Sequence, residues 1–246
     1  MTITIDGKSC TCKPGDFLLD IAKREGIDIP ALCHHGSLDG QGCCRICIVE
    51  VEVKGNRSLV TACIYPVEQE CTVFTNSDRV VRQRNMVLSL LQALAPESNK
   101  ISQLCADHGV VKYDRFVEQD GKKCILCGLC VKACKSLGTG AIATINRGVE
   151  KVVATPYDEP SIVCVGCASC AMVCPTDAIE VKENREERII WNRSFMFRFC
   201  KKCGTKVGTV AELMRSSKKI NSEIPELCEA CRKKSIADAL AGTFGS

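Results

Sequence analysis

Eight cysteines in the middle of the chain constrain its fold more than any other feature of the sequence. They form two groups, and within each group the cysteines are separated by two, two and three residues. The first group is Cys124, Cys127, Cys130 and Cys134, and the second is Cys164, Cys167, Cys170 and Cys174. A structural zinc site needs only pairs of thiolates. The repeated third and fourth cysteines therefore favour larger metal clusters over zinc knuckles or a disulfide framework.

The spacing is typical of bacterial ferredoxins with two [4Fe–4S] clusters, in which the fourth cysteine of each group binds the cluster of the other group. One cluster is then expected to be held by Cys124, Cys127, Cys130 and Cys174. The other is expected to be held by Cys164, Cys167, Cys170 and Cys134. Because each group completes the site of the other, we expect the clusters to lie close enough for fast electron transfer. We interpret the chain as an electron carrier.

The 21 cysteines of this 246-residue chain fit metal ligands in a reducing compartment better than a secreted disulfide scaffold. The N-terminal sequence lacks the basic and apolar segments of a secretory signal, and no apolar run approaches the ~18 residues of a membrane span. We therefore expect a cytoplasmic protein without a membrane span. The formal net charge of +4 is too small to indicate nucleic-acid binding.

The first 80 residues predict a small domain of the β-grasp type. Alternating apolar residues and the Asp6-Gly7 turn indicate a β-hairpin over 2–12. Asp16 is expected to cap a helix that ends at Gly26. The side chains that we expect this helix to bury are Phe17, Leu18, Ile21 and Ala22. Alternation of apolar and polar residues predicts further strands at 46–53, 59–63 and 71–75.

A third set of cysteines lies within this domain. Its members are Cys33, Cys44, Cys47 and Cys63. Four thiolates in a related pattern hold the [2Fe–2S] cluster of plant-type ferredoxins, so we expect such a cluster here. Cys43 is the alternative to its neighbour, but the two-residue gap before Cys47 favours Cys44. His34 and His35 leave open a Rieske-like site, in which two histidines replace two cysteines; otherwise they belong to a polar loop.

The C-terminal segment contains two further cysteine pairs. They are Cys200 with Cys203 and Cys228 with Cys231. Two such pairs are typical of a tetrahedral structural zinc site, and Gly204 permits a tight turn after the first pair. A third [4Fe–4S] cluster is the alternative, since spacing does not separate the two. The basic residues expected to offset the thiolate charge are Lys201, Lys202, Lys206, Arg232, Lys233 and Lys234.

Helices are expected on both sides of the two-cluster region. Apolar spacing predicts one at 78–95, closed by Pro96, and a second from about Ser98. In the C-terminal segment we expect helices at 209–219 and 235–240, and between Cys134 and Cys164 an extra hairpin. The cysteines left without a metal are expected to be structural thiols. They are Cys10, Cys12, Cys43, Cys71 and Cys105.

Two parts of the chain resemble a known family. The segments that carry the resemblance are Ile29–His35, Gly42–Val51 and Ala62–Val67 within 3–82, followed by 113–183. They resemble the N-terminal iron–sulfur region of the large complex I iron–sulfur subunit, iron-only hydrogenases, NAD-linked formate dehydrogenases and diaphorase subunits of NAD-reducing hydrogenases. The family usually carries a further cluster motif of one histidine and three cysteines between the two parts. Here only Cys105 and His108 remain there.

The resemblance implies an electron-transfer subunit of a soluble multi-subunit NAD(P)H-linked oxidoreductase. It would relay electrons between a flavin-bearing NAD(P)H-oxidising subunit and a second redox site or ferredoxin, with flavin-based electron bifurcation as one form. No glycine-rich dinucleotide motif or substrate site is found, so we expect no catalytic residues. An iron–sulfur subunit of a hydrogenase or formate dehydrogenase is the second hypothesis. A cluster-bearing redox sensor or scaffold is the third.

The predicted architecture is therefore α+β with four parts. We expect a [2Fe–2S] β-grasp domain at 1–80, a helical linker at 81–118, a two-[4Fe–4S] ferredoxin domain at 119–183 and a zinc-ribbon-like domain at 184–246. The predicted cofactors are one [2Fe–2S] cluster, two [4Fe–4S] clusters and one zinc ion or third [4Fe–4S] cluster.

Overall fold

The computed structural model describes residues 1–38, 40–111, 113 and 115–244. The chain divides into two compact units. The first unit comprises Met1–Lys132 and Val173–Ala178, and the second comprises Ala133–Met172 and Ile179–Ser246. Neither unit is continuous in sequence, and each is described by itself. The division into four parts stays a prediction.

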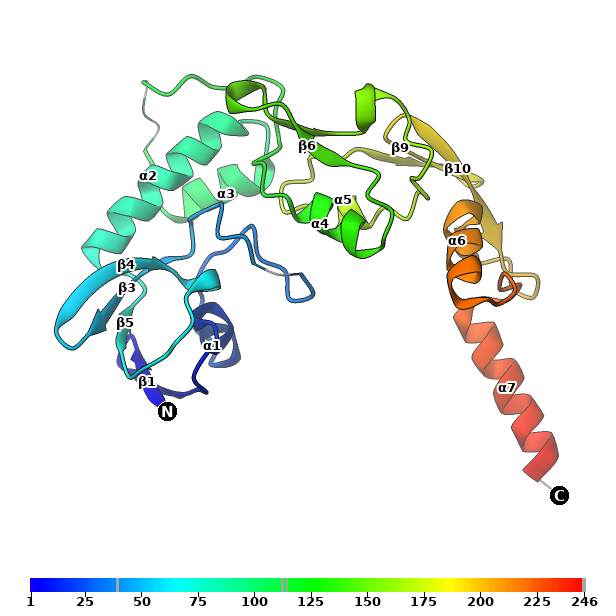
Figure 1. Cartoon of the computed structure of the whole chain (residues 1–246), viewed down its shortest axis with the longest axis horizontal. Helices are drawn as coiled ribbons and strands as arrows, with labels where there is room; N and C mark the ends of the chain where they lie inside the picture. The colour runs from blue at the N-terminus through cyan, green and yellow to red at the C-terminus, as the bar shows by residue number, and fades with distance from the viewer. Residues whose placement is uncertain (39, 112, 114, 245–246) are drawn as a thin grey trace. The chain divides into compact units, whose positions relative to one another are not determined.

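A five-stranded sheet forms the N-terminal part of the first unit (Figure 1). Its strands, in spatial order, are β2 (Lys8–Thr11), β1 (Thr2–Ile5), β5 (Thr72–Phe74), β3 (Ile48–Val53) and β4 (Asn56–Thr61). Strands β1 and β5 run parallel, and the other neighbours are antiparallel. A hairpin, a helix and returning strands confirm the predicted β-grasp arrangement.

The first hairpin turns at Asp6-Gly7, as the sequence predicts. Both residues have positive φ, 46° and 83°, which suits the two-residue turn that matches strand twist. The Asp6 carboxylate also accepts a hydrogen bond from the Thr75 backbone N–H at 2.8 Å. This bond ties the hairpin to the end of β5, a function that the turn motif alone does not reveal.

Helix α1 spans Leu18–Arg24, and its predicted start is wrong. The Asp16 side chain does not cap it, but accepts from the Lys13 N–H at 3.0 Å. Phe17 is extended and bridges to Pro66, so its side chain is 43% exposed instead of inward. The helix therefore begins one residue later than expected. The residues that it buries are Leu18, Leu19, Ile21 and Ala22.

Helices cover both faces of the sheet at β3. Val49 and Val51 share the core beneath α1, whereas Glu50, on the opposite face, is only 5% exposed. Its burial follows from the packing of helix α2 (Asp78–Leu94) against β3, and Arg79 pairs with its carboxylate at 3.4 Å. Polar residues of β3 are therefore not all exposed, although the alternation of apolar and polar residues suggests a strand with one solvent-facing side. A strand covered on both faces has no such side.

Helices α2 and α3 (Asn99–Asp107) confirm the predicted helix pair. The Ser77 side chain accepts from Val80 N–H at the start of α2, and Ser98 accepts from Ile101 N–H at the start of α3. Such caps satisfy backbone donors that have no partner within the helix. The tract 103–116 that leads to the two-cluster region includes Lys112 and Asp114, which lie outside the described residues.

The second unit contains the predicted extra hairpin and a sheet that the sequence analysis missed. The hairpin pairs β6 (Ala143–Ile145) with β7 (Val152–Ala154). The sheet has the order β11-β10-β9-β8. Its strands are β8 (Val181–Glu183), β9 (Glu187–Ile190), β10 (Arg193–Phe199) and β11 (Lys206–Thr209). It continues across the predicted boundary between residues 183 and 184.

The remaining helices are short, with one exception. They are α4 (Leu129–Ser136), α5 (Ser169–Met172), α6 (Val210–Ile220) and the long α7 (Glu229–Phe244). Three single 3₁₀ turns occupy Ala62–Ile64, Gly148–Glu150 and Pro156–Asp158. Helix α6 agrees with its prediction, whereas α7 begins six residues earlier than the expected 235–240. Among the described residues, no helix is long and apolar enough to cross a bilayer.

Arg84 is the largest buried polar side chain of the first unit and is 2% exposed. From α2 its guanidinium donates to three backbone carbonyls: Ile46 at 3.1 Å, Ile48 at 2.9 Å and Thr75 at 3.0 Å. Burial lowers its pKa, and the Cys47 thiol opposes that shift. Arg84 thus holds the backbone on both sides of Cys47.

We expect Arg84→Ala to destabilise the first unit by about 3 kcal/mol, because it leaves three carbonyls without their charged donor. The measurement is native-state hydrogen exchange of the β3 amides in the metal-loaded protein. Arg82 is exposed on the same helix, so Arg82→Ala is the matched control and should change the exchange rates little. Equal protection in both variants would contradict the bracing role of Arg84.

Candidate metal centres

The four cysteines of the predicted [2Fe–2S] site come together in the first unit. Cys33, Cys44, Cys47 and Cys63 are 1%, 4%, 0% and 2% exposed. Contacts with the Cys43, Cys44 and Cys63 thiols lower the pKa of Cys33, and the contact with Cys63 lowers the pKa of Cys47 to about 7. The Cys44 N–H lies 3.5 Å from the Cys33 sulfur. These four sulfurs therefore form one buried cluster.

Cys43 and Cys44 both reach Cys33, but their surroundings differ. Cys44 is buried, whereas Cys43 is exposed. The Cys43 sulfur also lies 3.5 Å from the Cys127 carbonyl oxygen. The choice of Cys44 as the ligand stays a prediction, and the burial of its sulfur favours it.

The two neighbouring histidines point to other partners. The His34 Nδ1 atom lies 3.1 Å from the Lys23 Nζ atom, and its Nε2 atom lies 3.6 Å from the Asp20 carboxylate. The His35 Nδ1 atom accepts from the Ser37 N–H at 3.2 Å. Both rings are thus engaged in polar contacts of the loop and of α1, which supports four cysteine ligands over a Rieske-like set.

The loop before Cys44 needs glycine at position 42. Gly42 has a φ of +60°, and a Cβ added there would lie 2.6 Å from the Cδ1 atom of Ile64. A side chain at this position would therefore push the loop away from the turn that carries Cys63. The close approach of the two segments places Cys44 and Cys63 on one site.

The first set of predicted [4Fe–4S] ligands also lies in the first unit. It consists of Cys124, Cys127 and Cys130 together with Cys174 from the segment Val173–Ala178. Burial raises the pKa of Cys127 to about 11 and of Cys130 to about 12, and the nearby Cys174 thiol adds to both shifts. The Cys124 sulfur lies 3.4 Å from the Leu126 N–H. This is the grouping that crossed ligation needs.

The second set lies in the second unit and comprises Cys164, Cys167, Cys170 and Cys134. Burial raises the pKa of Cys164, and the Cys134 thiol contributes to the rise. All four cysteines line one cavity. The Ala141 N–H lies 3.2 Å from the Cys134 sulfur, as the Ala178 N–H lies 3.3 Å from that of Cys174. The fourth cysteines of the two groups therefore share one kind of backbone donor.

Both cysteine loops repeat a left-handed backbone pattern. Leu126 and Gly128 have φ of 54° and 73° in the first loop, and Gly166 and Ala168 have 68° and 60° in the second. Alternation of this kind turns successive N–H groups toward one concave side, where they stabilise negative charge. The duplicated spacing of the sequence thus corresponds to a duplicated loop that suits anionic thiolates and clusters.

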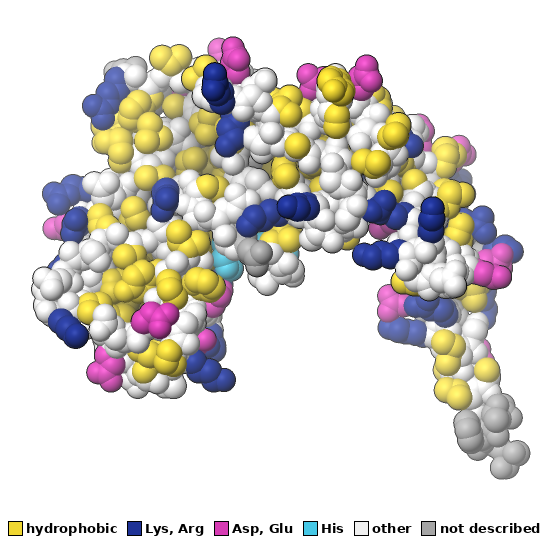
Figure 2. Space-filling model, viewed as in Figure 1, with side chains coloured by type: hydrophobic (Ala, Val, Ile, Leu, Met, Phe, Trp, Pro, Cys, Tyr) yellow, Lys and Arg dark blue, Asp and Glu magenta, His cyan; other side chains and the backbone are white. Residues whose placement is uncertain are grey.

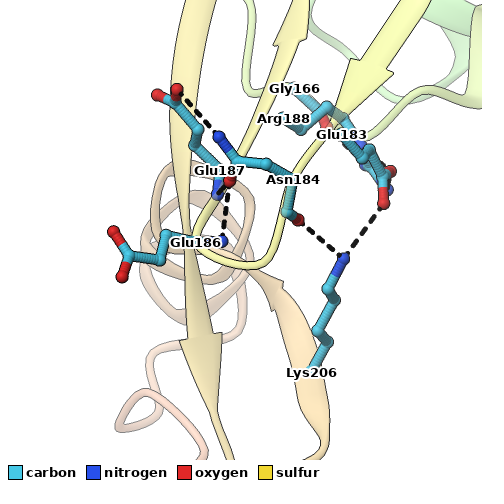
Figure 3. Close-up of polar contacts among 7 residues, drawn as sticks. All are labelled: Gly166, Glu183, Asn184, Glu186, Glu187, Arg188 and Lys206. Atoms are coloured by element: carbon cyan, nitrogen blue, oxygen red, sulfur yellow. Dashed lines mark hydrogen bonds and ion pairs between the residues drawn. The ribbon is translucent and has the colours of Figure 1, made fainter.

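Basic side chains hold the second cysteine loop. Arg188 donates to the Gly166 carbonyl at 2.6 Å, and Figure 3 shows it beside Glu183, which also accepts from Lys206. Arg193 donates to the Ser161 and Cys164 carbonyls at 2.7 and 3.3 Å. The sheet that the sequence analysis missed therefore supports the second cysteine set.

Asn184 shapes the turn that brings Arg188 into place. Its side-chain oxygen accepts from the backbone N–H groups of Glu186 and Glu187, both at 2.8 Å (Figure 3). The Arg188 guanidinium is the largest influence that lowers the pKa of the Glu183 carboxyl, and Lys206 adds to it. The two basic residues and Glu183 therefore connect β8, β9 and β11 at one end of the sheet.

Trp191 is a second residue that the sequence analysis missed. It follows β9 and lines the cavity together with the four cysteines of the second set. Its Nε1 atom is buried, yet it has no hydrogen-bond partner among the described residues. A residue outside every cysteine motif gives no signal in the sequence, so only the fold reveals its position.

Some cysteines of the predicted [2Fe–2S] set and of the first predicted [4Fe–4S] set share one apolar core. Cys33 and Cys44 pack in it with Cys127 and Leu129. At the contact between the two loops, a Cβ added to Gly128 would lie 2.8 Å from the Gln41 side chain. The two sites are thus neighbours within the first unit.

The four C-terminal cysteines form a more compact group. The sulfurs of Cys200, Cys203, Cys228 and Cys231 all lie within 4.8 Å of one another. Those of Cys203 and Cys228 are 3.6 Å apart. Backbone N–H groups, that of Cys228 first, lower the pKa of Cys200 to about 6. The structure therefore brings together all four cysteines of the predicted C-terminal site.

The basic residues around this group are partly paired with carboxylates. Lys201 pairs with Glu226, Lys206 with Glu183 at 3.2 Å, and Lys233 with Glu229 at 2.6 Å. Figure 2 shows further Lys and Arg side chains over α6. The positive charge expected to offset the thiolates therefore also offsets neighbouring carboxylates.

Four of the five unassigned cysteines are buried and one is exposed. Cys10, Cys12, Cys71 and Cys105 are buried, and Cys43 is exposed. The Cys105 sulfur lies 3.7 Å from the Leu88 carbonyl oxygen, within the apolar core of the first unit. This environment suits a small apolar side chain.

Comparison with known proteins identifies two domains. Residues 1–78 match the 2Fe-2S iron-sulfur cluster binding domain, and residues 117–181 match the 4Fe-4S dicluster domain. A chain from the crystal structure of an NAD⁺-reducing [NiFe]-hydrogenase in the H₂-reduced state superposes with a TM-score of 0.61 and 27% identity. The match covers 72% of this chain and 85% of that chain.

Curated relatives show the same similarity. The NADP-reducing hydrogenase subunit HndD of Solidesulfovibrio fructosivorans is 34% identical over 225 residues, and the NADPH-Fe(3+) oxidoreductase subunit alpha of Geobacter sulfurreducens is 30% identical over 229. These matches cover 78% and 83% of this chain but only 37% and 27% of the relatives. The chain therefore combines a 2Fe-2S domain with a 4Fe-4S dicluster domain and is similar to subunits of NAD(P)-linked hydrogenases and oxidoreductases.

Proposed function

We propose that the chain is an electron-transfer iron–sulfur subunit of a multi-subunit NAD(P)H-linked oxidoreductase. It relays electrons between a flavin-bearing NAD(P)H-oxidising subunit and a second redox site or ferredoxin, and flavin-based bifurcation is one form of this role. The observation that carries the proposal is that Cys33 and Cys44 of the [2Fe–2S] set share an apolar core with Cys127 of the first [4Fe–4S] set. Two redox centres in one core lie close enough to exchange electrons.

The proposed ligands follow the cysteine sets described above. Cys33, Cys44, Cys47 and Cys63 hold a [2Fe–2S] cluster. Two [4Fe–4S] clusters are held by Cys124, Cys127, Cys130 and Cys174, and by Cys164, Cys167, Cys170 and Cys134. Bound clusters supply electron storage, and the protein supplies thiolates and backbone N–H donors such as those of Ala141 and Ala178.

A hydrogenase subunit is the second candidate. The names of two relatives, an NADP-reducing hydrogenase subunit and an NAD⁺-reducing [NiFe]-hydrogenase, favour it. In that case the second redox site is a hydrogen-activating centre on another part of the complex. The electron-relay role of this chain is the same in both candidates, so identification of the subunits that purify with it separates them.

We further propose zinc for the C-terminal cysteines. Zn–S bonds of about 2.3 Å in tetrahedral geometry place the sulfurs about 3.8 Å apart, close to the 3.6 Å between Cys203 and Cys228. In a [4Fe–4S] cluster each thiolate binds a different iron, which requires a wider set. The spread of at most 4.8 Å therefore favours a single ion. Zinc there stabilises the fold without carrying electrons.

Metal analysis of the anaerobically purified full chain tests the cofactor set. We expect about ten irons per chain from one [2Fe–2S] and two [4Fe–4S] clusters, together with one zinc. About fourteen irons without zinc would assign a third [4Fe–4S] cluster to the C-terminal cysteines. About eleven irons without zinc would place a single iron there.

The neighbouring cysteines provide a matched pair of variants. We expect Cys44→Ala to remove the [2Fe–2S] cluster, because Cys44 is the buried ligand, and Cys43→Ala to retain it. The readout is iron content together with the electron paramagnetic resonance (EPR) spectrum of the reduced protein. Loss of the cluster in the Cys43→Ala protein alone would show that Cys43 is the ligand.

Reduction by nicotinamide cofactors tests the relay. We expect NADH or NADPH to bleach the iron–sulfur absorption of the chain when it is purified with its partner subunits. The isolated chain should not respond, because its flavin-bearing donor is missing, although dithionite reduces it. Direct reduction of the isolated chain by NAD(P)H, or no reduction within the complex, would contradict the proposed role.

A further inference from the structure

Trp191 is the only tryptophan of the chain, and it occupies an unusual backbone position. Ile190 at the end of β9 pairs with Arg193 at the start of β10, so Trp191 and Asn192 form the whole turn. Both residues have positive φ, 52° and 56°. Asn tolerates this region well, but a bulky residue rarely adopts it. Strained positions of this kind are concentrated at functional sites.

The indole of Trp191 belongs to the wall of the second cysteine cavity. The same wall contains the four cysteines of the second set and Ile190. The Nε1–H group is buried and makes no hydrogen bond to any described residue. A buried donor without a partner costs free energy, so this arrangement favours an acceptor inside the cavity.

The acceptors that line this cavity are the sulfurs of the second cysteine set, and a bound cluster would add its own sulfurs. A hydrogen bond to a sulfur favours negative charge on it. An indole N–H donated into the cavity would therefore stabilise negative charge there.

We propose that Trp191 is a positioning residue that donates its indole N–H to a sulfur of the second [4Fe–4S] cluster or of its cysteine ligands and raises the reduction potential of that cluster. This inference rests on the proposed function, because it needs a cluster held by Cys134, Cys164, Cys167 and Cys170. Reduction adds one electron, whose charge spreads onto the thiolate sulfurs. The indole proton stays on nitrogen and no bond breaks. Hydrogen bonds to sulfur are one of the influences that set cluster potentials.

The first [4Fe–4S] site provides the internal reference. Its cysteine loop repeats the left-handed pattern of the second, and a chain with one tryptophan has no second indole to offer it. The Trp191 indole therefore has no counterpart at the first site. The difference predicts that the second cluster is the easier of the two to reduce.

Trp191→Phe tests the proposal, because it removes the N–H and keeps an aromatic ring. We expect about a tenfold lower ratio of reduced to oxidised second cluster at a fixed potential, equivalent to about 59 mV for one electron. The first cluster should not change. Phe195 packs on Gly166 in the same loop without any donor, so Phe195→Leu is the matched control. Redox titration of the full chain, followed by EPR, gives both potentials.

Nitrogen-15 labelling of tryptophan tests the contact without a substitution. Since Trp191 is the only tryptophan, the label marks one indole nitrogen. We expect a nitrogen-15 coupling in the pulsed EPR spectrum of one reduced [4Fe–4S] cluster, which also identifies that signal as the second cluster. This measurement decides the question if Trp191→Phe loses iron.

Three results would overturn the proposal. They are an unchanged potential in iron-replete Trp191→Phe protein, an equal shift in Phe195→Leu, and no nitrogen-15 coupling to either cluster. Failure of the proposed function would look different. It would appear as an iron content below two [4Fe–4S] clusters per chain in the unmodified protein, before any potential is measured.

Discussion

The exchange of one cysteine between the two halves of the duplicated motif is the constraint on which the rest of the structure depends. Cys174 belongs to the first unit although its flanking helix α5 lies in the second, and Cys134 belongs to the second unit although α4 begins in the first. With the proposed ligands, each cluster would therefore bind cysteines from both groups of the duplicated motif. Such clusters would order short segments with little secondary structure, because metal–thiolate bonds can replace a large apolar core.

Arginine side chains that donate to backbone carbonyls near the cysteines are the second recurring feature of the structure. Arg84 donates to the carbonyls on both sides of Cys47, Arg193 donates to those of Ser161 and Cys164, and Arg188 donates to that of Gly166. The backbone carbonyls of the cysteine loops cannot all find hydrogen-bond partners within a sheet or helix. A guanidinium carries several N–H donors in a fixed plane, so one arginine side chain can pair with two or more of these carbonyls. Arg84 also lies near the Cys47 thiol and Arg193 near the Cys164 thiol, where each would stabilise negative charge on a bound cluster.

Local signals in the sequence predict the Asp6-Gly7 hairpin, the helix pair α2 and α3, and the sets of cysteines that the structure brings together. The metals that these cysteines hold stay predictions. Features that depend on contacts with residues far away in the sequence were predicted wrongly or missed. Glu50 looks like a solvent-facing strand residue, but α2 covers it; Phe17 looks like the start of a helical face, but its bridge to Pro66 keeps it extended. The sequence analysis missed the sheet from β8 to β11, because its strands are short and mix charged with apolar residues. It missed Trp191 because only the folded turn brings this residue to the cavity.

The C-terminal cysteines bear on the stability of helix α7, which follows them. Cys228 directly precedes α7 and Cys231 lies in its first turn, where the Cys231 N–H is 3.4 Å from the Cys228 sulfur. Unpaired N–H groups at the start of a helix favour negative charge, so two thiolates bound to the proposed metal would act as a cap. Helices in proteins gain most of their stability from packing of an apolar face, and the described side chains of α7 are largely exposed. The proposed metal would therefore couple the helical content of α7 to metal availability, and chelation would make this helix a substrate for proteases.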